Sequence, residues 1–238
     1  MNIRFQKKRF GKRRIGPPSV QVKKSEVEAL AFDYKNNKEE FWNAVTHGIG
    51  FVLSIPALIF LILKGSERGS ALHITAYTIF GVSMLILYLM STLLHSMPEK
   101  YKRFFSILDH SSIYILIAGT YTPLVLVSLG GSLGWTLFGI VWGLAVLGIL
   151  FKVFFIHRFE AVSLIFYIAM GWLIIFAIRP LHSQIGTNGI TLLVIGGLLY
   201  TVGAIFYAWR KIPYNHAIWH LFVIGGSAAM YFSVLLYG

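Results

Sequence analysis

Histidines at the ends of long apolar stretches are the residues best placed to do chemistry in this chain. His216 and His220 open the last apolar stretch four residues apart, so they share one face of a helix and can reach the same cation. His95 stands near the end of another apolar stretch and is the expected third ligand. Three imidazoles suit zinc and leave one coordination position open for water, as in catalytic zinc sites. The sequence therefore predicts a histidine-ligated Zn²⁺ site.

Two further polar side chains lie at equivalent positions in neighbouring apolar stretches. Asp109 begins one stretch, and Ser91 precedes His95 by one helical turn on a shared face. We predict a catalytic role for Asp109, which would hold or deprotonate a water molecule. His110 follows Asp109 but points about 100° away around a helix, so we do not expect both to face one ion.

Glu40, Asn43 and His47 form a third polar group, on one face of the first apolar stretch. They are interpreted either as a polar cap of that stretch at the membrane interface, which we favour, or as partners that orient the metal ligands. We expect His110 likewise to act as a partner that orients the metal ligands. A hydrogen-bonded network that only joins helices would use the same residue types, so the residues alone leave a structural role open.

Long apolar helices must position these groups. Hydrophobic residues make up 56% of the 238 residues and charged residues only 13%, well below the roughly 25% of a soluble domain. We predict an all-α integral membrane protein with seven transmembrane helices, since each stretch can cross a core about 30 Å thick. The expected spans are 41–63, 71–96, 107–128, 135–153, 161–178, 189–209 and 215–237.

The charge distribution predicts orientation and location. The net charge of +12 comes mainly from residues 1–38 and from short connections between apolar stretches. We expect residues 1–38 to form a mobile or surface-bound cytoplasmic tail that contacts anionic lipid headgroups, and 39–238 to form the transmembrane domain. The C-terminus would then lie outside. Membrane lipids, and not nucleic acid, are the expected partners, and a bacterial plasma membrane is the expected location. The oligomeric state is left open.

Four segments carry a resemblance to a known family. They are EFWNAVTHGIG from Glu40, STLLH from Ser91, LDHSSIYILIAGTYTP from Leu108 and NHAIWH from Asn215. With them the chain resembles hemolysin III proteins, the bacterial branch of the progestin and adipoQ receptor family, which includes the adiponectin receptors. The resemblance covers 39–238.

The resemblance implies a seven-helix fold with a cytoplasmic N-terminus and a zinc ion held by His95, His216 and His220. It also implies that Asp109 interacts with the water on the zinc, and that Ser91, one turn before the ligand His95, has a catalytic role in orienting substrate or water. The wider superfamily includes alkaline ceramidases, and the receptor branch resembles hydrolases of the ceramide amide. One departure is His110, where the receptor branch has a tyrosine.

Three functions remain as hypotheses. The leading one is a zinc-dependent intramembrane hydrolase that acts on a lipid amide or ester. The second is a pore-forming or membrane-lytic protein, although the polar groups gather at one end of the apolar stretches and do not line a whole span. The third is a sensor of membrane stress or energetics with a structural zinc.

Overall fold

The computed structural model describes the backbone of residues 24–156 and 158–238, and the side chains of residues 37–156 and 158–238. All regular structure in these residues is helical. The chain divides into residues 1–36 and residues 37–238, and all the described side chains belong to the second unit. Most of the predicted tail, 1–38, lies outside the described residues, so its behaviour stays a prediction.

The helices are α1 Lys24–Glu67, α2 Ala71–Ser96, α3 Glu99–Pro123, the π-helical η1 Leu124–Leu129, α4 Gly131–Phe155, α5 Glu160–Gly171, the 3₁₀ η2 Trp172–Ala177, α6 Ile178–Ala208 and α7 Asn215–Tyr237.

Within the described residues, six helical stretches are long and apolar enough to cross a membrane. The expectation of an all-α membrane protein is therefore confirmed, whereas the count differs from the predicted seven. The difference has one source: α5, η2 and α6 follow one another with no loop between them and count as a single stretch of 49 residues, Glu160–Ala208.

This long stretch folds back on itself at Gly186. Its φ of 66° and ψ of −178° interrupt the helical backbone, in a region that glycine adopts readily and other residues do not. Two contacts show the reversal. Glu160, at the start of the stretch, forms an ion pair with Arg210, just past its end, and the Trp172 Nε1–H donates to Thr201 Oγ1 at 3.1 Å. The two halves of the stretch therefore lie side by side and antiparallel.

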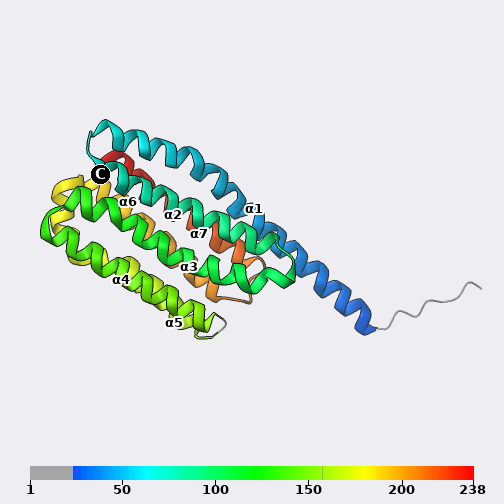
Figure 1. Ribbon diagram of the computed structural model, residues 1–238. Coiled ribbons are helices and arrows are strands. Elements are labelled where there is room, and N and C mark those ends of the chain that lie inside the picture. The colour runs from blue at the N-terminus through cyan, green and yellow to red at the C-terminus, as the bar shows by residue number, and fades with distance from the viewer. Residues whose placement is uncertain (1–23, 157) are drawn as a thin grey trace, which may run out of the picture. The chain divides into compact units, whose positions relative to one another are not determined.

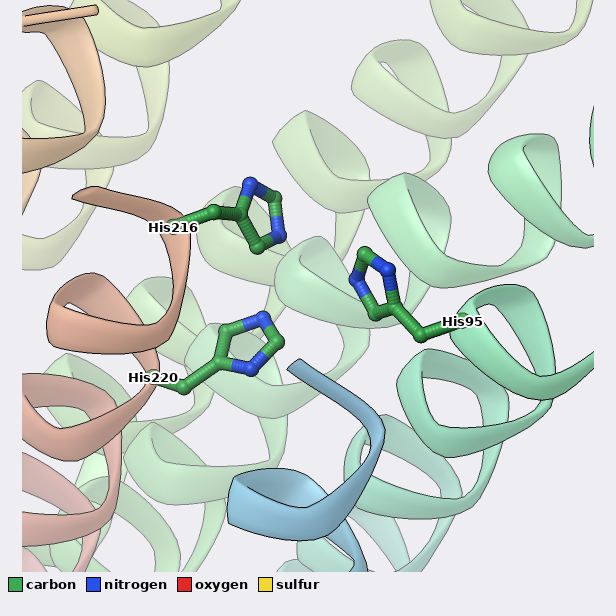
Figure 2. Close-up of side chains that lie close together, drawn as sticks. All are labelled: His95, His216 and His220. Carbon is green, nitrogen blue, oxygen red and sulfur yellow. The ribbon is translucent and has the colours of Figure 1, made fainter. Parts of the chain in front are cut away.

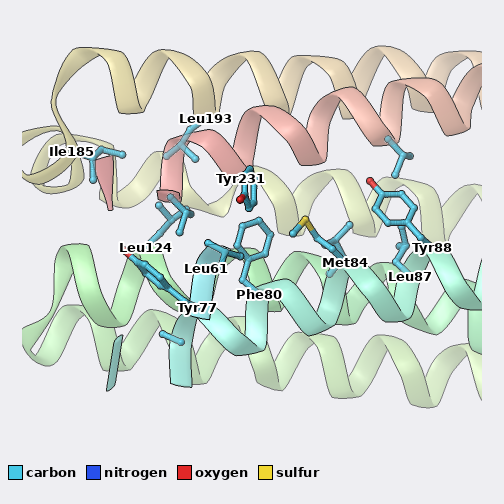
Figure 3. Close-up of a cluster of buried hydrophobic side chains, with 14 of the residues drawn as sticks. Leu61, Tyr77, Phe80, Met84, Leu87, Tyr88, Leu124, Ile185, Leu193 and Tyr231 are labelled. Atoms are coloured by element: carbon cyan, nitrogen blue, oxygen red, sulfur yellow. The ribbon is translucent and has the colours of Figure 1, made fainter. Parts of the chain in front are cut away.

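Helices neighbouring in sequence pack closely, with α2 against α3 and α6 against α7 (Figure 1). A Cβ on Gly119 of α3 would stand 2.3 Å from Ser83 Oγ of α2, so glycine permits this approach. Buried side chains of α1, α2, α6 and α7 form one apolar cluster, which includes Leu61, Phe80, Leu193 and Tyr231 (Figure 3).

A second apolar cluster joins α3, α4 and α5 and includes Tyr114, Val141 and Met170. Outside these clusters, large apolar side chains such as Phe60, Leu147 and Phe154 are exposed. Exposed apolar surface of this kind is expected where the solvent is lipid.

Candidate metal site

Three imidazoles meet between α2 and α7. His216 and His220 extend one turn apart from α7 toward His95 of α2, and the three rings surround a common space (Figure 2). One nitrogen from each ring can be chosen so that all three lie within 4.8 Å of one another. The ring centroids are 4.6 to 5.3 Å apart. This is the cluster predicted from the spacing of the histidines.

The outer nitrogen of His220 is held by α1. Its Nδ1 lies 3.1 Å from the backbone carbonyl oxygen of Asn43 and 2.9 Å from Thr46 Oγ1. Because a carbonyl oxygen only accepts, Nδ1 carries the proton of the neutral ring, and this assignment leaves a lone pair on Nε2. The Thr46 hydroxyl is within reach of the Trp42 and Asn43 carbonyls as a donor, so its oxygen is free to accept from His220.

His95 is held in the same way by a carboxylate of α1. Its Nδ1 lies 3.1 Å from Glu40 Oε2, which in turn forms an ion pair with Lys102 of α3. The Nε2 of His95 is buried and has no hydrogen-bond partner among the described residues. A carboxylate on one imidazole nitrogen with the other nitrogen bare is the usual arrangement of a metal-ligating histidine. The donor set therefore fits a zinc ion.

An open cavity adjoins the histidines. Both Asp109 and Ser91 line it, as do His216 and His220. Ser91 is only 1% exposed, and its Oγ has no hydrogen-bond partner among the described residues. The structure thus brings Asp109, Ser91 and two of the three clustered histidines, His216 and His220, to one cavity.

The residues of the first apolar stretch contribute unequally. Glu40 and the backbone of Asn43 contact the histidines, which favours the orienting interpretation over the interfacial cap. The Asn43 side-chain oxygen has no partner among the described residues. His47 is buried and stacks on His220 with ring centroids 3.5 Å apart, and neither of its nitrogens has a described hydrogen-bond partner.

His110 lies beside the cavity but turns one nitrogen away. Its Nδ1 donates to the Ser106 carbonyl at 2.8 Å and lies 3.5 Å from Asp109 Oδ2. His110 and Asp109 both line the cavity, yet neither belongs to the group of three histidines.

Thr46 and Lys102 were not predicted from the sequence. Thr46 lies one turn after Asn43 on the same helix face, so the spacing that singled out Asn43 was a signal for Thr46 as well. Lys102 looked like an ordinary loop charge. Its role depends on the packing of α3 against α1, for which the sequence offers no periodic signal.

Comparisons with known proteins agree with the motifs. The family model for "Haemolysin-III related" proteins matches residues 35–231. The chain is 60% identical over 201 residues to "Hemolysin-3" of Bacillus cereus, covering 84% of this chain and 92% of that protein. It is 59% identical over 201 residues to the "Hemolysin-3 homolog" of Bacillus subtilis strain 168, with 84% and 94% covered.

A more distant similarity reaches mammals. The chain is 29% identical over 194 residues to the human "Monocyte to macrophage differentiation factor", covering 75% of this chain and 80% of that protein. These comparisons confirm the resemblance to hemolysin III proteins that the four sequence segments indicated. The chain belongs to the haemolysin-III-related family and is a multi-pass membrane protein.

Proposed function

We propose that the protein is a zinc-dependent intramembrane hydrolase whose substrate is a lipid amide or ester. One observation carries the proposal: two of the three clustered imidazoles present a bare Nε2, because their Nδ1 atoms are already bonded to Glu40 and to the Asn43 carbonyl. A group that only joined helices would have no need to leave these nitrogens unpaired.

His95, His216 and His220 would hold the metal. When bound by three imidazoles, zinc polarises a substrate carbonyl and makes a water molecule more acidic. Asp109, which lines the same cavity, would take the proton of the attacking water and pass it to the leaving amine or alcohol. The unpaired Ser91 hydroxyl is available to orient that water or the scissile carbonyl.

We also propose seven membrane crossings with a cytoplasmic N-terminus and an external C-terminus. The reversal at Gly186 supports two crossings within the 49-residue stretch. The positive-inside rule supports the orientation, because Lys100, Lys102, Arg103 and Arg210 fall on the side of the histidine cluster. The likeness to Bacillus proteins supports a bacterial plasma membrane.

The first experiment measures metal content of detergent-purified protein by mass spectrometry. We expect near-stoichiometric zinc in the native chain and its loss in the variant His216→Ala, His220→Ala. A matched control, His73→Ala, His182→Ala, removes two histidines that are not part of the cluster and should retain the metal. Metal-free native protein would refute the zinc site.

The second experiment tests hydrolysis of ceramide and of ester lipids by the zinc-loaded protein. We expect turnover that Asp109→Asn abolishes while zinc stays bound. Stoichiometric zinc with no turnover of either lipid class would refute the hydrolase. It would favour a structural zinc in a sensor of membrane stress or energetics.

Membrane permeabilisation is the second candidate, because the relatives from Bacillus carry the name hemolysin. Away from the histidines, several buried hydroxyls are used within their own helices. Those of Ser83, Thr120 and Thr122 each donate to a backbone carbonyl three or four residues earlier. This use leaves little polar surface for a continuous pore lining. Dye-filled liposomes that stay sealed when the protein is reconstituted at high density would exclude this function.

A further inference from the structure

Lys152 is a buried cation that the proposed chemistry does not use. It lies in the last turn of α4, where a lysine of a membrane helix would normally extend to the aqueous interface, yet the residue is only 1% exposed. Among the described residues, none lies within hydrogen-bonding or ion-pairing distance of its ammonium group. An ammonium group in such a place is unfavourable unless something pairs with it.

The neighbouring carboxylate is already engaged. Glu160, at the start of α5, acts on Lys152 electrostatically but forms its ion pair with Arg210. The partner of Lys152 must therefore come from the space that it faces.

That space is the cavity beside the histidines. Lys152 lines it from α4, and Ser163 and Tyr167 line it from α5. The Tyr167 hydroxyl donates to the His110 carbonyl. Leucine and isoleucine side chains such as Leu116, Ile117 and Leu164 make up much of the remaining wall. Asp109 and Glu160 also line the cavity, and Glu160 is engaged by Arg210. A buried ammonium group that shares a largely apolar cavity with hydroxyl groups matches a lipid that has a single anionic group.

We propose that Lys152 binds the anionic group, a carboxylate or a phosphate, of a lipid whose chain occupies the cavity. The inference deepens the proposed function and rests on it, because it assigns a charged group to the substrate or to the fatty-acid product. Lys152 lies on α4 and the histidines lie on α2 and α7, so the anion site and the metal site belong to different helices. Anion binding can therefore be tested without metal.

The test measures binding of radiolabelled palmitate to metal-free full-length protein in a nonionic detergent, with hexadecanol and hexadecyl phosphate as competitors. We expect both anions to bind about tenfold or more tightly than the alcohol, since hydrogen bonds to charged groups are stronger than neutral ones. Tighter binding of palmitate would identify a fatty acid as the source of the anion, and tighter binding of the phosphate would identify a lipid headgroup.

Four variants decide the assignment. Lys152→Met, which keeps most of the length of the side chain, should lose the preference for anions, whereas Lys152→Arg should keep it. Lys64→Met removes a charge near the far end of α1 and should change nothing. The variant His216→Ala, His220→Ala should keep the preference even though it abolishes any zinc binding. A failed hydrolase would therefore leave this result intact.

Two outcomes would overturn the inference. One is native protein that binds palmitate, hexadecyl phosphate and hexadecanol equally. The other is a folded Lys152→Met variant that still prefers the anions. If Lys152→Met does not fold, the native protein and Lys152→Arg still decide: palmitate and hexadecyl phosphate must raise the thermal midpoint of both by more than hexadecanol does at the same concentration.

Discussion

Glu40→Gln is the substitution that best tests how the metal site is organised. Glu40 accepts a hydrogen bond from His95 Nδ1 at 3.1 Å and is also paired with Lys102. Glutamine has the same shape and can still accept one hydrogen bond, but it lacks the charge. The substitution therefore leaves the three ligands in place and changes only the group that orients one of them.

The expected effect is a weaker metal site and not an absent one. Loss of a carboxylate behind a ligating histidine typically lowers metal affinity about 10- to 100-fold. This corresponds to roughly 1.4 to 2.8 kcal/mol of binding free energy. We expect competition against a fluorescent zinc chelator, performed on detergent-purified protein, to show a Kd raised by this factor, whereas His95→Ala should raise it further.

The matched control is Glu67→Gln, the same change near the other end of α1. Glu67 is exposed and pairs with Lys64, so its loss should leave zinc affinity unchanged. An unaltered Kd in Glu40→Gln, together with weaker binding in His95→Ala, would refute an orienting role for Glu40. The ion pair with Lys102 would then serve only to join α1 to α3.

Three further predictions concern the site and the fold. Thr46→Val removes one of the two hydrogen-bond acceptors of His220 Nδ1 and should weaken zinc binding by less than about tenfold, since one hydrogen bond contributes roughly 1 kcal/mol. The same chelator competition measures the change in Kd. A loss of affinity as large as that in Glu40→Gln would contradict this prediction. Gly186→Ala should lower the thermal midpoint, because a left-handed φ of 66° costs other residues on the order of 1 to 3 kcal/mol, whereas Gly171→Ala, in open space, should not. Removing zinc with a chelator should lower the thermal midpoint, and adding zinc back should raise it in proportion to the logarithm of the free zinc concentration. An unchanged midpoint would show that zinc does not stabilise the folded state.

The sequence predicted the three clustered histidines from helical periodicity and from their positions at the ends of apolar stretches. The spacing of His216 and His220 follows from helical periodicity, and the position of His95 at the end of an apolar stretch placed it at the same end of the bundle. The individual contacts between α1 and the other helices could not be predicted in this way. That Glu40 reaches His95, and that Lys102 reaches Glu40, depends on how α1, α2 and α3 pack.

The number of helical stretches shows the same limit. Apolar composition located both halves of Glu160–Ala208, but the polar residues between them are also helical except at Gly186, so no loop separates the halves. Many glycines in this chain occur in helices or turns without marking a reversal. Gly186 is distinguished by its backbone angles and by the Glu160–Arg210 pair, and both depend on the packing of the two halves.

The role of α1 is explained by these contacts. It supplies none of the three ligands, yet its Glu40 side chain and its Asn43 carbonyl bond the outer nitrogens of His95 and His220. Each of these bonds fixes a tautomer, and each also joins α1 to α2 or to α7. Docking of α1 and binding of a metal therefore favour the same state of the imidazoles, so each must stabilise the other by the same free energy. In this arrangement α1 would govern the affinity of the proposed metal site, while α2 and α7 would supply its ligands.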